Sequence, residues 1–169
     1  MHIHAYEKLW LACSVLLILF LIGTVTYGAV GPGIAMVADS EQPIDAQNLD
    51  ESERFADPGV EQVGENEYAA YVVAYQFGFT PDPIVVPANS TVTFYVTSRD
   101  VTHGFEVAGT NANTMVIPGE VATLTVETAE PQEYGLLCNE YCGAGHHAME
   151  GKVHVVSQSE FESEGGDGE

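Results

Sequence analysis

The feature that most constrains this chain is a long uncharged apolar run close to its N-terminus. Residues 9–30 (LWLACSVLLILFLIGTVTYGAV) contain no Asp, Glu, Lys or Arg. A helix needs ~20 consecutive apolar residues to cross a bilayer core, whereas the apolar core of a signal peptide is typically ~7–15 residues long. The run therefore predicts a retained, single-pass transmembrane helix; cleavage as a signal peptide near Ala38 is the alternative. Lys8 precedes the run and the chain after it soon becomes acidic, so we expect a cytoplasmic N-terminus and the remainder outside the cell membrane.

The pattern of the chain predicts four segments. Residues 1–36 are expected to form the cytoplasmic N-terminus and the anchor helix, and residues 37–66, which are acidic and interrupted by Pro and Gly, a loosely packed linker. Residues 67–157 consist of short β-branched and aromatic runs separated by turn residues, which predicts an all-β antiparallel sandwich or small barrel. Residues 158–169 are acidic and Gly-rich and are expected to form a frayed tail. The expected strands are residues 68–77, 91–97, 121–127, 134–138 and 152–156.

The charge of the chain excludes some partners. There are 4 Lys and Arg residues against 25 Asp and Glu residues, a formal net charge of −21. So few cations cannot neutralise a run of phosphates, which excludes nucleic acid, and they argue against docking on an anionic membrane surface. Because 46% of the residues are hydrophobic, the acidic groups are expected to coat a folded core. Such a coat predicts a protein from a halophile; an acidic protein from an ordinary cell is the alternative.

The chemistry of the chain is concentrated in residues 138–149 (CNEYCGAGHHAM). One Cys with two His and a Met is the ligand pattern of a one-copper electron-transfer site. A second Cys on the same loop allows two sulfur atoms to bridge a pair of copper ions, with one His capping each metal and the Met and a backbone carbonyl as weaker ligands. A structural zinc site and a disulfide are the alternatives. The ligand-type residues are His103, Cys138, Cys142, His146 and Met149.

The Cys-x-x-x-Cys-x-x-x-His-x-x-Met loop, with an upstream His-Gly-Phe, resembles the dinuclear copper (CuA) domain of cytochrome c oxidase subunit II. The single helix and the stretches at residues 5–8, 77–83 and 109–111 resemble the B-type haem–copper oxidases. This resemblance covers nearly the whole chain and is weakest in the linker and the tail. It implies a cupredoxin-like Greek-key sandwich on one N-terminal transmembrane helix, holding two copper ions.

The resemblance also implies a role for individual residues. The copper ligands would be the ring nitrogens of His103 and His146, the bridging thiolates of Cys138 and Cys142, the thioether of Met149 and the backbone carbonyl of Glu140.

Three further roles follow from the same resemblance. The side chain of Glu140 matches a magnesium ligand of the mitochondrial-like branch, with a solvated carboxylate as the alternative. Glu7 matches an acidic residue at the entrance of a proton-uptake channel; an ordinary helix-end charge is the alternative. Phe77 and Phe79 are expected in the core, and are candidates for the aromatic patch that receives electrons from the donor.

The implied function is that of the subunit that admits electrons to a terminal oxidase of the respiratory chain. Single electrons would come from an external cytochrome c or small blue copper protein and pass to haem in subunit I, where oxygen is reduced. The chain would thus be part of an oxidoreductase. A free-standing, membrane-anchored copper carrier or copper chaperone is the alternative. A nitrous-oxide-reducing enzyme would need a second large domain, and the complete ligand set argues against a copper-free quinol-oxidase subunit.

Overall fold

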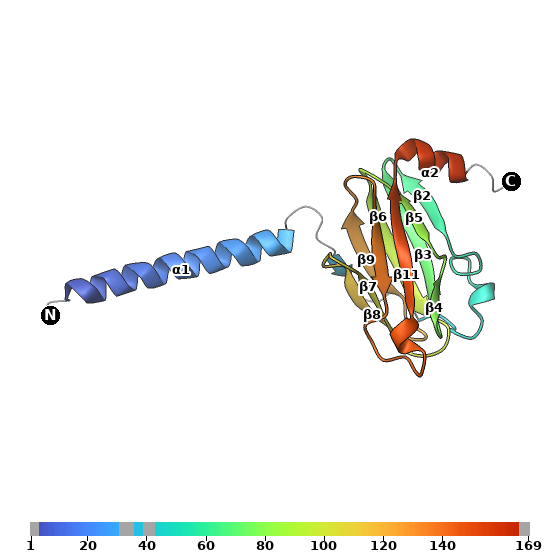
Figure 1. The fold of residues 1–169 in the computed structure, drawn as a ribbon, viewed down its shortest axis with the longest axis horizontal. Helices are drawn as coiled ribbons and strands as arrows, with labels where there is room; N and C mark the ends of the chain where they lie inside the picture. Colours follow the sequence, from blue (N-terminus) through green and yellow to red (C-terminus); the bar gives the residue numbers. More distant parts are fainter. Residues whose placement is uncertain (1–3, 31–35, 39–42, 166–169) are drawn as a thin grey trace. The chain divides into compact units, whose positions relative to one another are not determined.

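The computed structural model describes residues 4–30, 36–38 and 43–165. The chain divides into two compact units, Met1–Ile34 and Ala35–Glu169. The first unit contains one helix, α1 (Ala5–Val30) (Figure 1). Residues Ala5–Gly28 are long and apolar enough to cross a membrane, and the large apolar side chains are exposed on every side of the helix. A helix that is apolar all round suits a lipid environment, which agrees with the predicted anchor.

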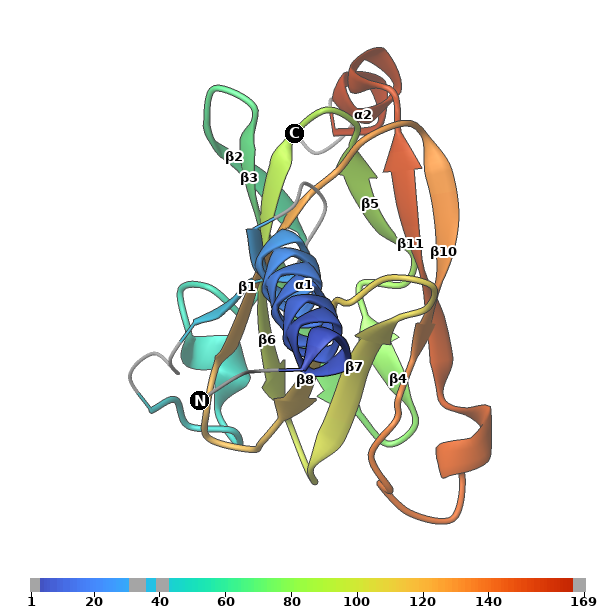
Figure 2. The ribbon, with the colours of Figure 1, turned by 90° about the vertical axis from the view of Figure 1, so that its left-hand side faces the viewer.

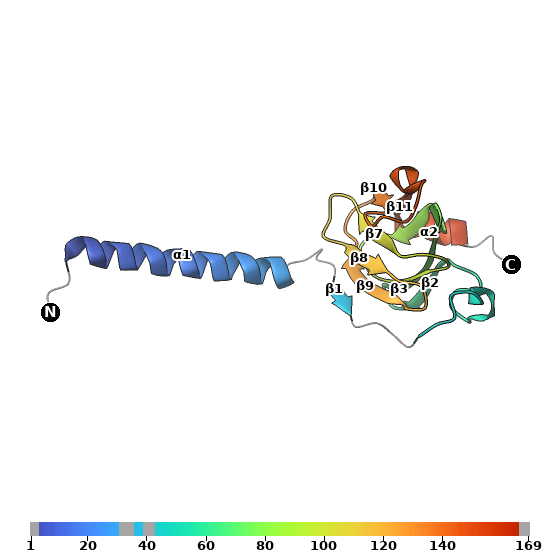
Figure 3. The ribbon, with the colours of Figure 1, turned by 90° about the horizontal axis from the view of Figure 1, so that it is seen from below.

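The second unit is a sandwich of two β-sheets, which face each other in Figures 2 and 3. One sheet has the order β1-β9-β6-β3-β2, with β4 paired to β3, and the other has the order β5-β11-β10-β7-β8. The strands of the first sheet are β1 (Met36–Ala38), β2 (Val60–Gly64), β3 (Glu67–Tyr75), β4 (Gly78–Thr80), β6 (Thr91–Ser98) and β9 (Ala122–Glu127). Those of the second are β5 (Ile84–Pro87), β7 (His103–Val107), β8 (Asn113–Val116), β10 (Gln132–Leu137) and β11 (Glu150–Val156).

The expected strands are all present, with small changes in their ends, and the all-β sandwich is confirmed. Two strand pairs, however, are parallel: β3 with β6 and β5 with β11. Strands β1, β2, β4, β5, β7 and β8, which have no more than five residues each, were not expected, because runs this short show little alternation along the sequence. Strand β2 lies within the segment that was predicted to be a linker.

The core lies between the two sheets and is built from alternating inward-facing residues. In β6 the buried positions Val92, Phe94 and Val96 alternate with half-buried neighbours, which is the pattern of a strand with one face in the core. Phe94 meets Phe105 of β7 with ring centroids 5.5 Å apart, and Phe79 of β4 meets the same ring edge-on at 6.0 Å. These aromatic contacts join the two sheets.

The segment predicted as a loosely packed linker is packed against the sandwich from residue 43 onward. Leu49, in the short 3-10 helix η1 (Leu49–Glu51), and Phe55 are each 1% exposed. They form a second hydrophobic cluster with Val73 and Val121. The prediction failed because two isolated apolar residues in an acidic segment have no periodicity, yet each fills a site on the outer face of a sheet. Residues 39–42 of this segment lie outside the described residues.

The segment predicted as a frayed tail begins with a short helix, α2 (Gln158–Gly165). Phe161 packs edge-on against the buried ring of Tyr68, with centroids 5.3 Å apart. The side-chain amide of Gln158 donates a hydrogen bond of 2.6 Å to the Tyr68 hydroxyl. The Phe161 ring therefore fixes a segment whose acidic, Gly-rich composition predicted a frayed tail. Residues 166–169 of this segment lie outside the described residues.

Candidate metal centre

The candidate metal-binding side chains come from two places at one end of the sandwich. His103 is the first residue of β7, and the others lie on the loop between β10 and β11. This loop, residues 138–149, is called the metal loop below. These two strands form an antiparallel pair in which Leu137 opposes Glu150. The Cys138 N–H donates to the Met149 carbonyl at 3.3 Å, so the neck of the loop continues the ladder. The 3-10 helix η2 (His146–Ala148) lies within this loop, at the opposite end of the sandwich from α2 (Figure 1).

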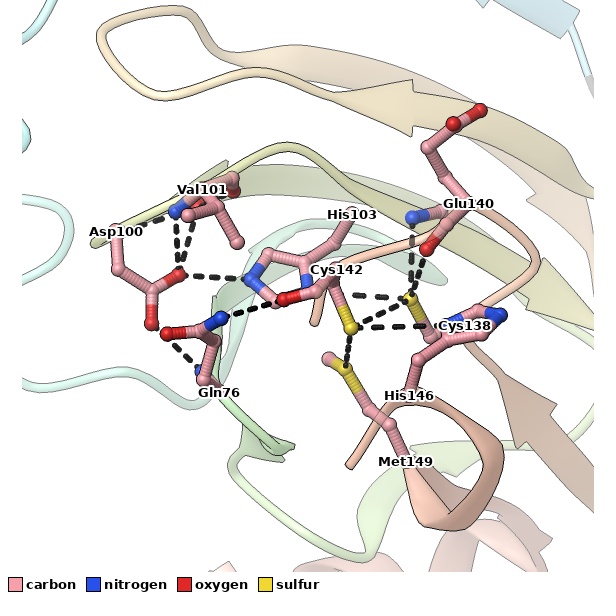
Figure 4. A network of polar contacts seen from close by, with 11 residues as sticks. Gln76, Asp100, Val101, His103, Cys138, Glu140, Cys142, His146 and Met149 are labelled. Carbon is pink, nitrogen blue, oxygen red and sulfur yellow. Dashed lines mark hydrogen bonds and ion pairs between the residues drawn. The ribbon is translucent and has the colours of Figure 1, made fainter. Parts of the chain in front are cut away.

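The donor atoms of all six predicted ligand residues converge on the two cysteine sulfurs (Figure 4). The Sγ atoms of Cys138 and Cys142 are 3.8 Å apart. This is far beyond the ~2.05 Å of a disulfide, and both cysteines are free. The other four donor atoms each lie beside one sulfur: His103 Nδ1 at 3.8 Å and the Glu140 carbonyl oxygen at 3.2 Å from Cys138 Sγ, and His146 Nδ1 and Met149 Sδ each at 3.6 Å from Cys142 Sγ.

The centre is buried on the sheet side and open on the loop side. His103 has no exposed surface, and Cys138, Cys142 and Met149 are 7%, 4% and 3% exposed, while His146 is half-buried. Burial, together with the neighbouring Cys138 sulfur, raises the pKa of the Cys142 thiol to about 11. The dry side favours a fixed set of ligands, whereas the open side leaves His146 near the surface.

The chemistry of the donor set fits copper. Cysteine and methionine sulfur are soft ligands, and imidazole suits copper as well as zinc. A structural zinc site is closed by four nitrogen or sulfur ligands, whereas a fifth such donor, the Met149 sulfur, points into this cluster. The ligand atoms of His103, Cys138 and Cys142 all lie within 4.8 Å of one another. They are thus close enough together to bind one metal ion.

Two features missed by the sequence analysis hold the ligands. The His103 Nε2 atom faces the Asp100 carboxylate at 2.8 Å. Burial raises the pKa of Asp100, but hydrogen bonds from His103 and from the backbone N–H groups of Gln76 and Val101 outweigh it and hold that pKa below its usual value. A carboxylate three residues before a predicted His ligand was a signal available in the sequence, because metal-binding histidines commonly donate their other ring N–H to such a group.

The second missed feature is Gly104, directly after His103. Its backbone N–H points at Cys138 Sγ at 3.5 Å. A Cβ atom at this position would lie 1.8 Å from Asn139 Oδ1 and 2.8 Å from the Asn139 backbone nitrogen. Only glycine therefore allows β7 to approach the metal loop this closely.

The other predicted functional residues lie in different surroundings. Phe79 is 2% exposed, as expected of a core residue, but Phe77 is 39% exposed, which corrects its expected place in the core. Phe77 lies in the turn after β3, with its ring against Gly143 and Gly145 of the metal loop. The Glu140 side chain is exposed and directed away from the sulfur atoms (Figure 4). In α1, the Glu7 carboxylate accepts a hydrogen bond of 2.9 Å from the His4 N–H, which is the geometry of a helix N-terminal cap.

The sequence and the fold are similar to those of known oxidase subunits. A family model described as cytochrome c oxidase subunit II, periplasmic domain, matches residues 69–156. Cytochrome c oxidase subunit 2 of Thermus thermophilus is 40% identical over 154 residues, which make up 89% of this chain and 92% of that protein. Heme-copper oxidase subunit 2 of Aeropyrum pernix is 35% identical over 111 residues, 57% of this chain and 47% of that protein.

Solved structures share the fold. A chain from the cryo-EM structure of a heme-copper terminal oxidase dimer superposes with a TM-score of 0.64 at 30% identity, over 89% of this chain and 99% of that chain. The periplasmic domain of subunit II of the cytochrome oxidase of Bradyrhizobium japonicum shares the fold with a TM-score of 0.53 at 22% identity, over 56% of this chain and 88% of that chain. The chain therefore belongs to the cytochrome c oxidase subunit II family.

Proposed function

We propose that this chain receives single electrons at a dinuclear copper (CuA) centre and passes them to haem in subunit I of a haem–copper terminal oxidase. The observation that carries the proposal is the convergence of four donor atoms on two cysteine sulfurs that lie 3.8 Å apart. One mononuclear site would leave part of this donor set unused. When bound, two copper ions supply a one-electron acceptor whose charge is shared between both metals.

In this proposal the two thiolates would be shared by both coppers, and the other four donors lie beside one sulfur or the other. Cys138 and Cys142 would hold both metals through their thiolates. His103 and the Glu140 carbonyl lie on the Cys138 side, and His146 and Met149 on the Cys142 side. Because β7 and the neck between β10 and β11 fix the ligands, few atoms have to move when the charge changes, and this favours rapid transfer.

An exposed aromatic residue beside the metal loop, Phe77, supports a position for electron uptake. Phe77 is 39% exposed and its ring contacts the loop backbone at Gly143 and Gly145. Phe79 is buried beneath the surface, so the burial favours Phe77 as the residue that meets the donor. The donor would be a cytochrome c or a small blue copper protein, and the expected orientation places this surface outside the cell membrane, with the N-terminus of α1 in the cytoplasm.

Two finer roles complete the proposal. The Glu140 carboxylate, exposed and turned away from the sulfurs, would be available to a magnesium ion at the contact with subunit I. This is tested by replacing the magnesium with Mn²⁺ in the assembled oxidase and recording electron paramagnetic resonance (EPR). The Mn²⁺ signal should be lost or changed in Glu140→Gln. The role of Glu7 in proton uptake stays a prediction. The carboxylate also accepts the hydrogen bond from the His4 N–H at the start of α1.

The dinuclear centre is tested on the full chain in detergent, loaded with copper. We expect an EPR signal in which one unpaired electron is shared between two copper nuclei, together with visible thiolate-to-copper bands. Cys142→Ser should abolish the shared signal and leave the β-sandwich folded, because residue 142 lies outside the paired residues of β10 and β11. A shared signal that persisted in Cys142→Ser would contradict the bridging role. A single-nucleus signal in the unmodified chain would indicate a one-copper carrier instead.

The partner is tested separately by purification of the chain from its native membrane. We expect a haem-containing subunit to co-purify in a fixed ratio. A copper-loaded chain that purified without haem would favour the free-standing carrier, although the relatives that match most of this chain are oxidase subunits.

A further inference from the structure

Gln76 and Asp100, which are distant in the sequence, meet at the edge of the metal centre. Strands β3 and β6 are parallel, with Ala74 opposite Ser98, and the Arg99 N–H donates to the Ala74 carbonyl at 3.0 Å. Parallel neighbours end at the same edge of a sheet. Gln76, just after β3, therefore lies beside Asp100, which is in the turn that carries the chain from β6 to His103.

The Asp100 carboxylate is oriented by groups on both of its oxygens, including the Ser98 hydroxyl at 3.5 Å from Oδ1. Its Oδ2 atom accepts the Gln76 backbone N–H at 2.7 Å. Its Oδ1 atom accepts the Val101 N–H at 2.6 Å and faces His103 Nε2 at 2.8 Å. A hydrogen bond from Nε2–H to this oxygen leaves the Nδ1 lone pair of His103 directed at the sulfur side of the centre. The Gln76 backbone is thus one of the groups that fix the plane of the His103 ring.

The side chain of Gln76 reaches the other half of the centre. Its Nε2 amide donates a hydrogen bond to the backbone carbonyl of Cys142 (Figure 4). The next residue, Gly143, has a φ of +130°, and a Cβ atom there would lie 2.7 Å from Gln76 Nε2. A side chain at position 143 would therefore displace the amide, whereas glycine lets the loop pass directly over it.

We propose that Gln76 is a positioning residue that joins the two halves of the metal centre. Its backbone N–H holds Asp100, and through it the ring of His103, while its side-chain amide holds the segment that carries Cys142. The distance between the two halves is thereby fixed before a metal binds, although they come from strands in different parts of the sequence. This inference rests on the proposed function for its consequence in electron transfer, but the contacts themselves do not involve a metal.

The test with copper uses the full chain in detergent and the variant Gln76→Leu. Leucine keeps the backbone N–H to Asp100 and replaces the amide arm with an apolar side chain of similar size. The matched control is Gln62→Leu, because the Gln62 Nε2 atom also donates to a backbone carbonyl, that of Gly64 at 3.0 Å, in strand β2. We expect Gln76→Leu to release copper to a chelator about tenfold faster than the unmodified chain and to alter its copper hyperfine pattern. The Gln62→Leu control should leave both unchanged, and equal rates in the two variants would overturn the proposal.

A second variant guards against a folding defect. Gln76→Asn keeps a polar amide in this exposed turn but is one methylene too short to reach the Cys142 carbonyl. It should change copper release and the hyperfine pattern in the same direction as Gln76→Leu. An asparagine variant that matched the unmodified chain would overturn the role of the amide arm.

A metal-free measurement separates this inference from the proposed function. Alkylation of each thiol by iodoacetamide is followed by peptide mass spectrometry, which also resolves the exposed Cys13. In the metal-free chain we expect Cys142 to react about fivefold faster in Gln76→Leu than in Gln62→Leu, as the loss of one hydrogen bond implies. If the unmodified chain bound no copper pair, the proposed function would fail, yet the alkylation rates would still decide this inference: equal rates overturn it.

Discussion

At the scale of single residues, the metal centre depends both on glycines that leave room for close contacts and on specific donor atoms. Gly104 lets the backbone of β7 approach Asn139, and Gly145 lies where a Cβ atom would meet the Phe77 ring. The donors are likewise specific atoms: the Met149 sulfur lies 3.6 Å from Cys142 Sγ and is 3% exposed. Small substitutions should therefore separate packing from chemistry.

Met149→Leu should retain the shared copper signal but raise the reduction potential of the centre. The thioether stabilises the more positively charged oxidised pair more than the reduced pair, so its loss favours reduction. Leucine conserves the volume, so the free energy of unfolding should change by less than about 1.5 kcal/mol. Redox titration measures the potential, with the exposed Met115→Leu as the control. An unchanged potential would contradict the proposal that Met149 is a copper ligand.

Gly145→Ala should destabilise the protein by about 1–3 kcal/mol, as expected for overpacking. The new Cβ atom would lie 2.5 Å from Cδ2 of Phe77, so the ring or the loop has to move. Denaturant unfolding of the full chain measures the free energy. Gly59→Ala is the control, because a Cβ atom there meets nothing within 4 Å. Equal stability of the two variants would show that the ring moves aside freely.

At the scale of elements, segments outside the two sheets are fixed by a few large side chains. Phe55, after η1, packs edge-on against Tyr71 with centroids 5.8 Å apart and is 1% exposed. Phe161 of α2 does the same against Tyr68. The metal loop, by contrast, is held at its neck by the ladder of β10 and β11. A substitution in the Phe55 cluster should therefore change the stability of the sandwich without changing the chemistry of the loop.

Phe55→Ala should lower the free energy of unfolding by about 3–5 kcal/mol, because it empties a buried aromatic site. Copper loading should be unchanged, since the cluster of Phe55 contains none of the ligand residues. Denaturant unfolding and EPR measure the two effects. The control Val63→Ala, at a side chain that is 58% exposed, should change stability by less than about 0.5 kcal/mol. A stability loss as small as that of the control would mean that residues 43–58 are a linker after all.

At the scale of the whole molecule, the net charge of −21 opposes the compact state through mutual repulsion of carboxylates. Local attraction offsets only part of this. In the sandwich, Arg99 pairs with Asp50 at 3.0 Å and Lys152 with Glu133 at 2.9 Å, and both pairs are exposed and weak. The stability of the chain should accordingly depend on salt.

We expect the unfolding temperature to rise between 0.1 M and 2 M KCl, since the screening length falls from about 10 Å to below about 3 Å. Thermal unfolding in a neutral detergent measures the change. A variant with Glu127→Gln and Glu130→Gln, both at exposed positions, should show a smaller rise. A flat dependence on KCl would contradict the prediction of a halophilic protein. The same screening would weaken attraction between the acidic surface and the proposed basic cytochrome c, so the proposed blue copper donor would compete better in molar salt.

The sequence by itself determined the features whose residues are close together along the chain. The apolar run set the length of α1, and the spacing from Cys138 to Met149 placed five donor groups on one loop. Only the tertiary structure decided which distant residues meet them, because that depends on strand register and on packing between sheets. It brought His103 to the loop, joined Gln76 to both halves of the centre, and exposed Phe77 while it buried Phe79. Spacing along one loop is local and legible in a sequence, whereas the pairing of parallel strands β3 and β6 leaves no local pattern that would place Gln76 beside Asp100.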